Sequence, residues 1–342
     1  MEQQNNSRNN NKGNRWTLTI VLCLFIAVAV LGAVNLLSGH KESPLSAKES
    51  MESTGDFSNT SHRDDEQREA VPVILDQANA ISVNITAENA IVMNTGTNTA
   101  LYQKNGTDRI APASTAKMIT ALTVLDHCPP EDEVTVGSEI EMIHEDSSTA
   151  WLTKGDTLTV RQLLIALMLP SGNDAAYTLA VHTGKKIAGD NSLTNKQSID
   201  VFMDKVNKKA QTLGAKSSNF VVPDGYDAEG QYTTAYDLAL IAKACLDNPI
   251  ISEIVASHTS YEKWLNGREV TYNNTNELLN PNSQWYRSEV IGLKTGNSSL
   301  GGAGLISAAV INGETYICVV MGTNKDARFQ DSIDIYDKIE AQ

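Results

Sequence analysis

Three short motifs follow one another along this chain: Ser114-Thr115-Ala116-Lys117, then Ser171-Gly172-Asn173, then Lys294-Thr295-Gly296. Between them they supply a hydroxyl nucleophile, an amine that can act as its base, a second hydroxyl beside an amide, and a cation that can hold a carboxylate. This set of groups predicts acyl transfer through a serine. Each motif alone occurs by chance in many sequences, and the order of all three makes the interpretation specific.

The first motif supplies the nucleophile and its base. A spacing of three residues puts Ser114 and Lys117 on one face of a helix, one turn apart. A serine hydroxyl attacks poorly until a neighbouring group takes its proton, and a lysine with an ordinary pKa of about 10.4 is protonated at neutral pH. Burial, a helix N-terminus and a second cation, Lys294, all favour the neutral amine. We therefore predict that Ser114 is the nucleophile and Lys117 its base.

The second motif lies in a loop that the sequence places between two helices. The hydroxyl of Ser171 is predicted to relay a proton from Lys117 to the leaving amine. The amide of Asn173 is predicted to hold either Lys117 or the substrate backbone. Since Ser-Gly-Asn alone is more often a turn than a catalytic loop, these roles depend on the other two motifs.

The third motif follows an apolar strand. We predict that the ammonium of Lys294 and the hydroxyl of Thr295 bind the terminal carboxylate of the substrate. Gly296, which has no side chain, lets the substrate backbone lie close to the strand. An oxyanion hole needs two donors aimed at the developing charge, and the backbone N–H groups of Ser114 and Asn297 are the candidates.

The elements that must position these motifs are predicted from apolar periodicity, capping residues and turn composition. A capping box of Thr159 and Gln162 marks one helix start, and the turn Asn312-Gly313 joins the last two strands. We expect strands at 91–93, 100–103, 289–293, 303–311 and 315–321. We expect helices from Ser114 to the Pro129-Pro130 pair, at 160–169, at 198–213, from Thr234 onward, and at 329–339.

The N-terminal third is organised differently. Residues 1–15 carry Arg8, Lys12 and Arg15 and are predicted to form a short cytoplasmic tail, followed by an uncharged apolar run at 16–37 that is long enough to cross a bilayer. Residues 38–75 are polar and read as a disordered tether. The catalytic domain is expected at 76–342, outside the cytoplasm, in a cell-membrane protein that spans the bilayer once. A cleaved signal peptide is the alternative for the apolar run.

The composition excludes several classes of function. Asp and Glu number 41 against 27 Lys and Arg, and this acidic balance argues against nucleic acid as a partner. Six histidines and no Cys/His cluster of zinc spacing argue against a metal hydrolase, so we expect no catalytic metal and no cofactor. The four cysteines, at 23, 128, 245 and 318, are widely separated and are predicted to be small buried residues rather than disulfides.

Over residues 80 to 342 the chain resembles the serine-type D-alanyl-D-alanine carboxypeptidases, the low-molecular-weight penicillin-binding proteins. The resemblance implies an α/β fold of the α+β type, in which helices sandwich an antiparallel sheet and one lobe is mostly helical, as in β-lactamases and transpeptidases. It also implies an acyl-enzyme on Ser114, release of terminal D-Ala from the peptidoglycan stem peptide, and inhibition by β-lactams. The segments that carry it are 110–118, 171–176, 234–239, 274–279 and 292–296.

Some positions depart from the usual family pattern. Pro170 precedes the second motif, and Asn297 with Gly301-Gly302 follows the third, where a different loop is usual. Neither change removes a predicted catalytic side chain. Arg328 lies where relatives often carry an arginine, and we assign it no role. The N-terminal apolar run is expected to serve as the anchor that a C-terminal helix provides in many relatives.

Three alternative functions remain open at this stage. A class A β-lactamase carries Asp between Ser and Asn of the second motif and a Glu that activates water. Here Gly172 stands between them, and Glu277 is too near Lys294 in sequence to fit. A non-catalytic penicillin-binding sensor needs a cytoplasmic output, for which residues 1–15 are short. A D,D-transpeptidase shares the acyl-enzyme and differs only in the acceptor, so the motifs do not separate it from a carboxypeptidase.

Overall fold

The computed structural model describes residues 73–342. The predicted cytoplasmic tail, the transmembrane anchor, nearly all of the tether, and Cys23 lie outside the described residues. Among residues 73–342, no helix is both long enough and apolar enough to cross a bilayer.

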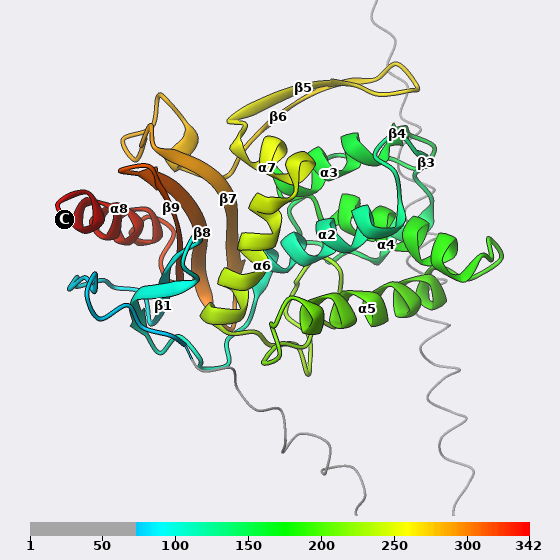
Figure 1. The fold of residues 1–342 in the computed structure, drawn as a ribbon. Helices are drawn as coiled ribbons and strands as arrows, with labels where there is room; N and C mark the ends of the chain where they lie inside the picture. The colour runs from blue at the N-terminus through cyan, green and yellow to red at the C-terminus, as the bar shows by residue number, and fades with distance from the viewer. Residues whose placement is uncertain (1–72) are drawn as a thin grey trace, which may run out of the picture. The chain divides into compact units, whose positions relative to one another are not determined.

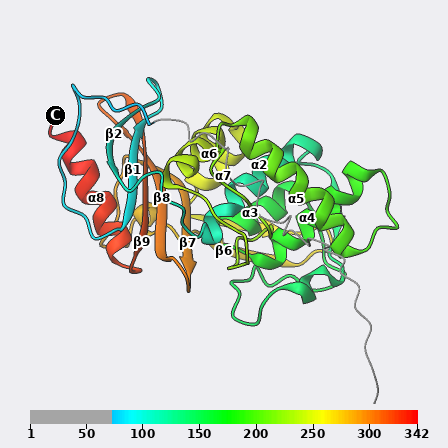
Figure 2. The ribbon, with the colours of Figure 1, turned by 90° about the horizontal axis from the view of Figure 1, so that it is seen from below.

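One antiparallel sheet of five strands, in the order β2-β1-β9-β8-β7, is the centre of the fold (Figures 1 and 2). Asn312 and Gly313 join β8 to β9 with φ angles of 52° and 83°, the left-handed pair that a two-residue hairpin turn requires, as the sequence predicted. The strands are β1 (Asn89–Asn94), β2 (Thr99–Lys104), β7 (Val290–Ser298), β8 (Gly302–Ile311) and β9 (Glu314–Thr323).

Helices cover both faces of this sheet. Every residue of β1 is buried, because its side chains alternate between two cores. Ile91 and Met93 pack into the core shared with the helical lobe, whereas Ala90 and Val92 pack into the core under α8 (Ala327–Glu340). Figure 1 shows α8 on one face and α6 on the other. The predicted helix–sheet–helix sandwich is confirmed.

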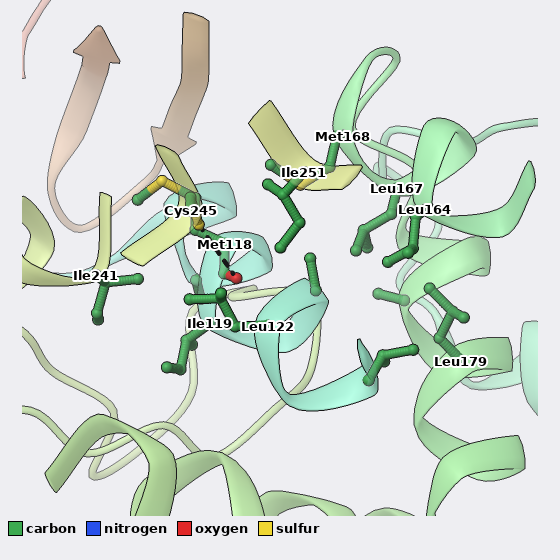
Figure 3. Close-up of a cluster of buried hydrophobic side chains, with 14 of the residues drawn as sticks. Met118, Ile119, Leu122, Leu164, Leu167, Met168, Leu179, Ile241, Cys245 and Ile251 are labelled. Carbon is green, nitrogen blue, oxygen red and sulfur yellow. Dashed lines mark hydrogen bonds between the residues drawn. The ribbon is translucent and has the colours of Figure 1, made fainter. Parts of the chain in front are cut away.

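The second lobe is mostly helical. Its central helix, α2, is buried from Lys117 to Val124, because other helices of this lobe pack around it. Figure 3 shows Met118 and Leu122 of α2 among apolar side chains of α3, α4, α6 and α7. The helices are α2 (Lys117–His127), α3 (Val160–Met168), α4 (Asn173–Ala188), α5 (Asn195–Thr212), α6 (Ala235–Asp247) and α7 (Pro249–Ala256).

The predicted state of the cysteines is confirmed where it can be observed. Cys128, Cys245 and Cys318 are buried and unpaired. The thiol of Cys245 lies 3.7 Å from the backbone oxygen of Met118, which links α6 to α2 within the apolar core (Figure 3).

Several elements differ from the expected ones. Helix α5 begins at Asn195 rather than 198, because Thr194 and Gln197 form a capping box that the apolar pattern does not show. The third motif lies inside β7 rather than after it, because Gly296 and Asn297 continue the pairing with β8. Four short elements and one helix were not expected: β3 (Glu133–Thr135), β4 (Thr157–Thr159), β5 (Thr259–Lys263), β6 (Glu269–Asn273) and α7.

Candidate active site

The predicted nucleophile stands at the entrance to α2. Ser114 lies in a 3-10 turn, η1 (Ala113–Ala116), and keeps part of its surface exposed while the rest of that turn is buried. Ala113 adopts a left-handed φ of 50°, a conformation that costs a non-glycine residue about 1 kcal/mol or more. A Cβ atom at Gly225 would lie 1.9 Å from the Ala113 oxygen, so the loop at Gly225 packs directly against the strained turn.

The predicted base is fully enclosed by neutral hydrogen-bond acceptors. The Nζ of Lys117 donates to the Oγ of Ser114 at 2.8 Å, to the Oδ1 of Asn173 at 2.7 Å and to the backbone oxygen of Asp224 at 2.9 Å. Burial lowers the pKa of Lys117 to about 8, although Asp224 and Asp174 act in the opposite direction. A substantial fraction of this amine is therefore neutral near pH 8 and can take a proton from Ser114.

The second motif links two helices, as the sequence predicted. Asn173 is the first residue of α4, and its Nδ2 donates to the Oγ of Ser147 at 2.9 Å. The neighbouring Asp174 fixes the facing loop, because its carboxylate accepts the backbone N–H groups of Ala150 and Leu152 at 2.8–3.0 Å. This arrangement orients the amide oxygen of Asn173 toward Lys117.

Ser171 has a different environment from Asn173. It adopts a left-handed φ of 64°, and its backbone oxygen accepts a hydrogen bond from Ser148 at 2.6 Å. Its buried hydroxyl has no hydrogen-bond partner among residues 73–342. The structure thus joins Ser114, Lys117 and Asn173 directly, and gives the Ser171 hydroxyl an unused donor and acceptor.

The third motif brings a buried cation to the same region. Lys294 is 1% exposed, and its Nζ donates to the backbone oxygen of Thr295 at 3.2 Å. Burial, followed by the positive charges of Lys117 and Arg328, holds the pKa of Lys294 well below its usual range. A bound carboxylate would act against all three effects, so this position favours an anionic ligand.

The strand that carries the third motif lies against the turn that carries Ser114. A Cβ atom at Gly296 would lie 3.1 Å from the Cγ2 of Thr115 and 3.2 Å from the Cβ of Ala113. The hydroxyl of Thr295 shares a 2.6 Å hydrogen bond with that of Thr275. A side chain at position 296 would therefore pack unusually tightly against the turn of Ser114, and its neighbours would have to move by a few tenths of an ångström.

A cleft of about 580 Å³ opens beside Ser114. Ser114 and Asn297, whose backbone N–H groups are the predicted oxyanion donors, both line it, as does Asn173. The other walls are the loop at 146–148, the loop at 225–227, the facing ends of β7 and β8 with Ser299 between them, and residues 323–325 at the end of β9. The nucleophile therefore faces a solvent-accessible space, while its base lies behind it.

Several residues of the site were not found from the sequence. The backbone oxygen of Asp224 holds Lys117, and the carboxylate of Asp227 accepts hydrogen bonds from Ser298 and Ser299 across the cleft. Only the Asp-Gly pair at 224–225 carried a local signal, and that signal indicates a turn. Arg328 also takes part: its Nη1 lies 3.2 Å from the Gly296 oxygen.

Comparison with known proteins settles the family. A family model described as D-alanyl-D-alanine carboxypeptidase matches residues 75–325. The chain belongs to this family. The D-alanyl-D-alanine carboxypeptidase DacD of Escherichia coli (strain K12) is 34% identical over 223 residues, which are 62% of this chain and 52% of that relative. The carboxypeptidase DacB2 of Mycobacterium tuberculosis is 34% identical over 212 residues, 61% of this chain and 66% of that relative.

A solved structure supports the same conclusion for the fold. The crystal structure of the Streptomyces K15 DD-transpeptidase matches with a TM-score of 0.69 and 33% identity, and the match covers 77% of this chain and all of that one. The predicted D-alanyl-D-alanine carboxypeptidase resemblance and the predicted fold class are therefore confirmed. The chain spans between half and two thirds of the length of the curated carboxypeptidases DacD and DacB2.

Proposed function

We propose that this chain is a serine D,D-carboxypeptidase that removes the terminal D-Ala from peptidoglycan stem pentapeptides through an acyl-enzyme on Ser114. The observation that carries the proposal is the 2.8 Å contact between the Oγ of Ser114 and the Nζ of Lys117. A buried lysine that has lost much of its charge is the kind of base that a serine nucleophile needs near neutral pH.

Acylation begins when Lys117 takes the proton of Ser114 and the serine oxygen attacks the carbonyl carbon between the two D-Ala residues. The carbonyl oxygen gains negative charge, and the backbone N–H groups of Ser114 and Asn297 stabilise it. When the C–N bond breaks, the proton passes from Lys117 through the hydroxyl of Ser171 to the leaving amine. Free D-Ala departs and an ester remains on Ser114.

Deacylation repeats these steps with water as the nucleophile. Water loses a proton to Lys117, attacks the ester carbon and displaces the Ser114 oxygen, which recovers a proton. Asn173 keeps Lys117 oriented toward Ser114 through both half-reactions, since its Oδ1 accepts a hydrogen bond from the Nζ of Lys117 at 2.7 Å. The shortened stem peptide then leaves.

The specificity for a peptide with a free C-terminus would come from Lys294 and Thr295. The buried ammonium of Lys294 becomes favourable once a carboxylate lies beside it, and the hydroxyl of Thr295 supplies a further hydrogen bond. Gly296 leaves room for the substrate backbone along β7. β-Lactam antibiotics, which carry a carboxylate beside a reactive amide, are expected to acylate Ser114 and inhibit the enzyme.

We also propose that residues 16–37 anchor the protein in the cell membrane with the N-terminus in the cytoplasm. The uncharged apolar run and the basic residues before it support this orientation. The catalytic domain would then act on the cell wall from the outer side of the membrane. Glycosylation or protease accessibility mapping that placed residues 73–342 in the cytoplasm would refute this topology.

The test is mass spectrometry of the protein with a peptide that ends in Lys-D-Ala-D-Ala. The wild type should release one D-Ala and form a covalent penicillin adduct on Ser114. Ser114→Ala should do neither, while Ser192→Ala, which changes an exposed serine, should behave as the wild type. If the native chain forms the penicillin adduct but releases no D-Ala, the carboxypeptidase proposal is wrong.

A D,D-transpeptidase is the second candidate, because the solved structure matched over its whole length is titled a DD-transpeptidase. Both reactions share the Ser114 ester, and an amine then competes with water for it. Adding an amine acceptor such as glycylglycine to the same assay separates them. A product extended by the acceptor, formed in excess over the hydrolysed peptide, would favour the transpeptidase.

A further inference from the structure

Three side chains of types that bind metals converge where the C-terminal end of α2 lies beside α4. Cys128 follows the last turn of α2, Asp132 lies in the turn after it, and His182 projects from α4. The cysteine sulfur, a carboxylate oxygen of Asp132 and an imidazole nitrogen of His182 all lie within 4.8 Å of one another. Within residues 73–342, no other Cys, His, Asp and Glu side chains form such a group.

The histidine of this cluster has an unused nitrogen. The Nε2 of His182 is buried and has no hydrogen-bond partner among the described residues. Buried polar atoms are nearly always paired, so this ring nitrogen is available to bond a ligand or a water molecule. A neutral imidazole carries a lone pair on one of its two ring nitrogens, and this is the form of histidine that binds metals.

The cysteine and the aspartate complete a mixed donor set. Cys128 is 2% exposed, and its sulfur lies 3.5 Å from the hydroxyl of Thr183. The carboxylate of Asp132 pairs with the ammonium of Lys186, whose side chain is 40% exposed. Lys186 therefore supplies one positive charge to the cluster, and it is long and accessible enough to move into solvent when another cation binds.

We propose that Cys128, Asp132 and His182 bind a divalent ion of the zinc class, with water as the fourth ligand. Sulfur, nitrogen and oxygen donors together suit Zn²⁺ or Co²⁺ better than Mg²⁺ or Ca²⁺. A tetrahedral zinc ion with bonds of about 2.0–2.3 Å holds its ligand atoms about 3.3–3.7 Å apart. The cluster reaches that size when its atoms approach by roughly 1 Å, which side-chain rotation supplies.

Binding changes the protonation of the site. The thiol of Cys128 must lose its proton to solvent when the metal–sulfur bond forms, and burial raises the pKa of that thiol. The affinity for the metal should therefore increase with pH. His182 also lines a neighbouring cavity of about 270 Å³, together with Lys185.

The position of the cluster indicates a structural role for the ion. Helices α2 and α4 pack against each other, and their first residues are Lys117 and Asn173, which touch at the other end. An 11-residue helix is about 16 Å long, so the ion would lie far from Ser114 and take no part in the chemistry. It would instead tie together the two helices that hold the base in place.

Titration of the full chain with Co²⁺ tests the site, because a thiolate–cobalt bond produces a strong absorption band in the near ultraviolet. The wild type should show the band with one Co²⁺ per chain, lose it on addition of excess Zn²⁺, and gain several degrees in Tm with Zn²⁺. Cys128→Ser should abolish the band. Cys245→Ser is the control, because Cys245 is also buried in this lobe but does not belong to the cluster. This variant should keep the cobalt band.

Two further variants distinguish this site from adventitious binding. His182→Ala should weaken Co²⁺ binding at least tenfold. Lys186→Met, which removes the competing ammonium, should tighten it by about two- to fivefold. A wild-type chain that shows no thiolate–cobalt band overturns the proposal, whatever the folding of the variants. A band that survives in a folded Cys128→Ser protein overturns it as well.

Discussion

The Nζ of Lys117 lies 2.7 Å from the Oδ1 of Asn173, although the two residues are 56 positions apart in sequence. Lys117 opens α2 and Asn173 opens α4, so this contact joins the N-termini of two helices. Helix N-termini carry partial positive charge, which disfavours an ammonium between them. The lysine is hydrogen-bonded to a hydroxyl, an amide oxygen and a backbone oxygen, and none of these neutral acceptors fixes its proton as a carboxylate would.

The pH dependence of catalysis should report the charge of Lys117. Its neutral form is the base, so kcat/KM should fall on the acid side of a midpoint near pH 8, the value to which burial lowers its pKa. Asp224 raises this pKa, and Asp224→Asn should therefore move the acid limb to lower pH by about half to one unit.

The control for this experiment is Asp247→Asn, an exposed carboxylate paired with Lys243 on the surface of α6. It should leave the pH profile unchanged. If Asp224→Asn moves the limb to higher pH, or if the wild type shows no acid limb between pH 6 and 9, Lys117 is not the base.

Gly225 should be irreplaceable, and Gly230 should not. Both glycines have positive φ, 79° and 77°, so alanine strains the backbone equally at each, by about 1 kcal/mol. A Cβ at 225 would also meet the Ala113 oxygen at 1.9 Å, whereas nothing lies within 4 Å of one at 230. Gly225→Ala should lower the free energy of unfolding by at least about 3 kcal/mol and abolish acylation.

Gly230→Ala, in the same loop, should cost about 1 kcal/mol and keep most of the activity. Urea unfolding and the rate of fluorescent-penicillin labelling measure both effects. Equal losses in the two variants would mean that strain in the loop, and not contact with the turn of Ser114, makes the glycine necessary.

Much of this arrangement was predictable from the sequence, because it depends on local spacing. Ser114 and Lys117 meet because they are one helical turn apart, and the second motif lies between α3 and α4 as its composition predicted. The sheet strands carried clear apolar patterns. Local patterns of this kind can be recognised in the sequence without knowledge of the tertiary fold.

Other parts were not predictable, because they depend on contacts between distant segments. The backbone oxygen of Asp224 accepts a hydrogen bond from Lys117, which is 107 positions away in sequence. Every residue has such an oxygen, so the residue type at this position does not reveal the contact. The hairpin β5–β6 is mostly polar and half exposed. Strand β5 has one apolar residue, and the alternation in β6 is limited to Val270 and Tyr272, which is too short a pattern to predict a strand. The strand β7 extends through the third motif because β8 pairs with it, whereas the apolar pattern of the sequence ends at Leu293 and places the motif after the strand.

Arg328 should contribute to recognition of the substrate carboxylate. It is mostly buried, its Nη1 donates to the Gly296 oxygen, and its positive charge acts on Lys294. Arg328→Met keeps the bulk and removes the charge. KM for a peptide with a free C-terminus should rise by about tenfold, since charged hydrogen-bond partners contribute about 1.5–3 kcal/mol.

A peptide with a C-terminal amide provides the comparison, because it lacks the negative charge. The variant and the wild type should process the amide equally poorly. A loss of the same size with both peptides would assign Arg328 to the support of β7 alone, with no electrostatic role toward the substrate.

Asp227 should hold two loops together at one wall of the cleft. Its carboxylate accepts hydrogen bonds from the Oγ of Ser298 at 2.6 Å, from the backbone N–H and Oγ of Ser299 at 3.0 and 2.8 Å, and from the backbone N–H of Leu300 at 3.3 Å. These bonds tie the loop after Gly225 to the connection between β7 and β8. Asn297, a predicted oxyanion donor, directly precedes Ser298 at the end of β7.

Asp227→Ala removes all four bonds, so residues 297–301, the end of β7 and the connection after it, should exchange their backbone hydrogens at least tenfold faster while the core strands stay protected. Acylation by penicillin should slow by about tenfold, because Asn297 is no longer held against the cleft. Asp227→Asn keeps one acceptor oxygen, so its exchange and acylation rates should lie between those of the wild type and those of Asp227→Ala. Faster exchange with unchanged acylation would mean that the hydrogen bonds of Asp227 stabilise only the loop, and that Asn297 keeps its position in their absence.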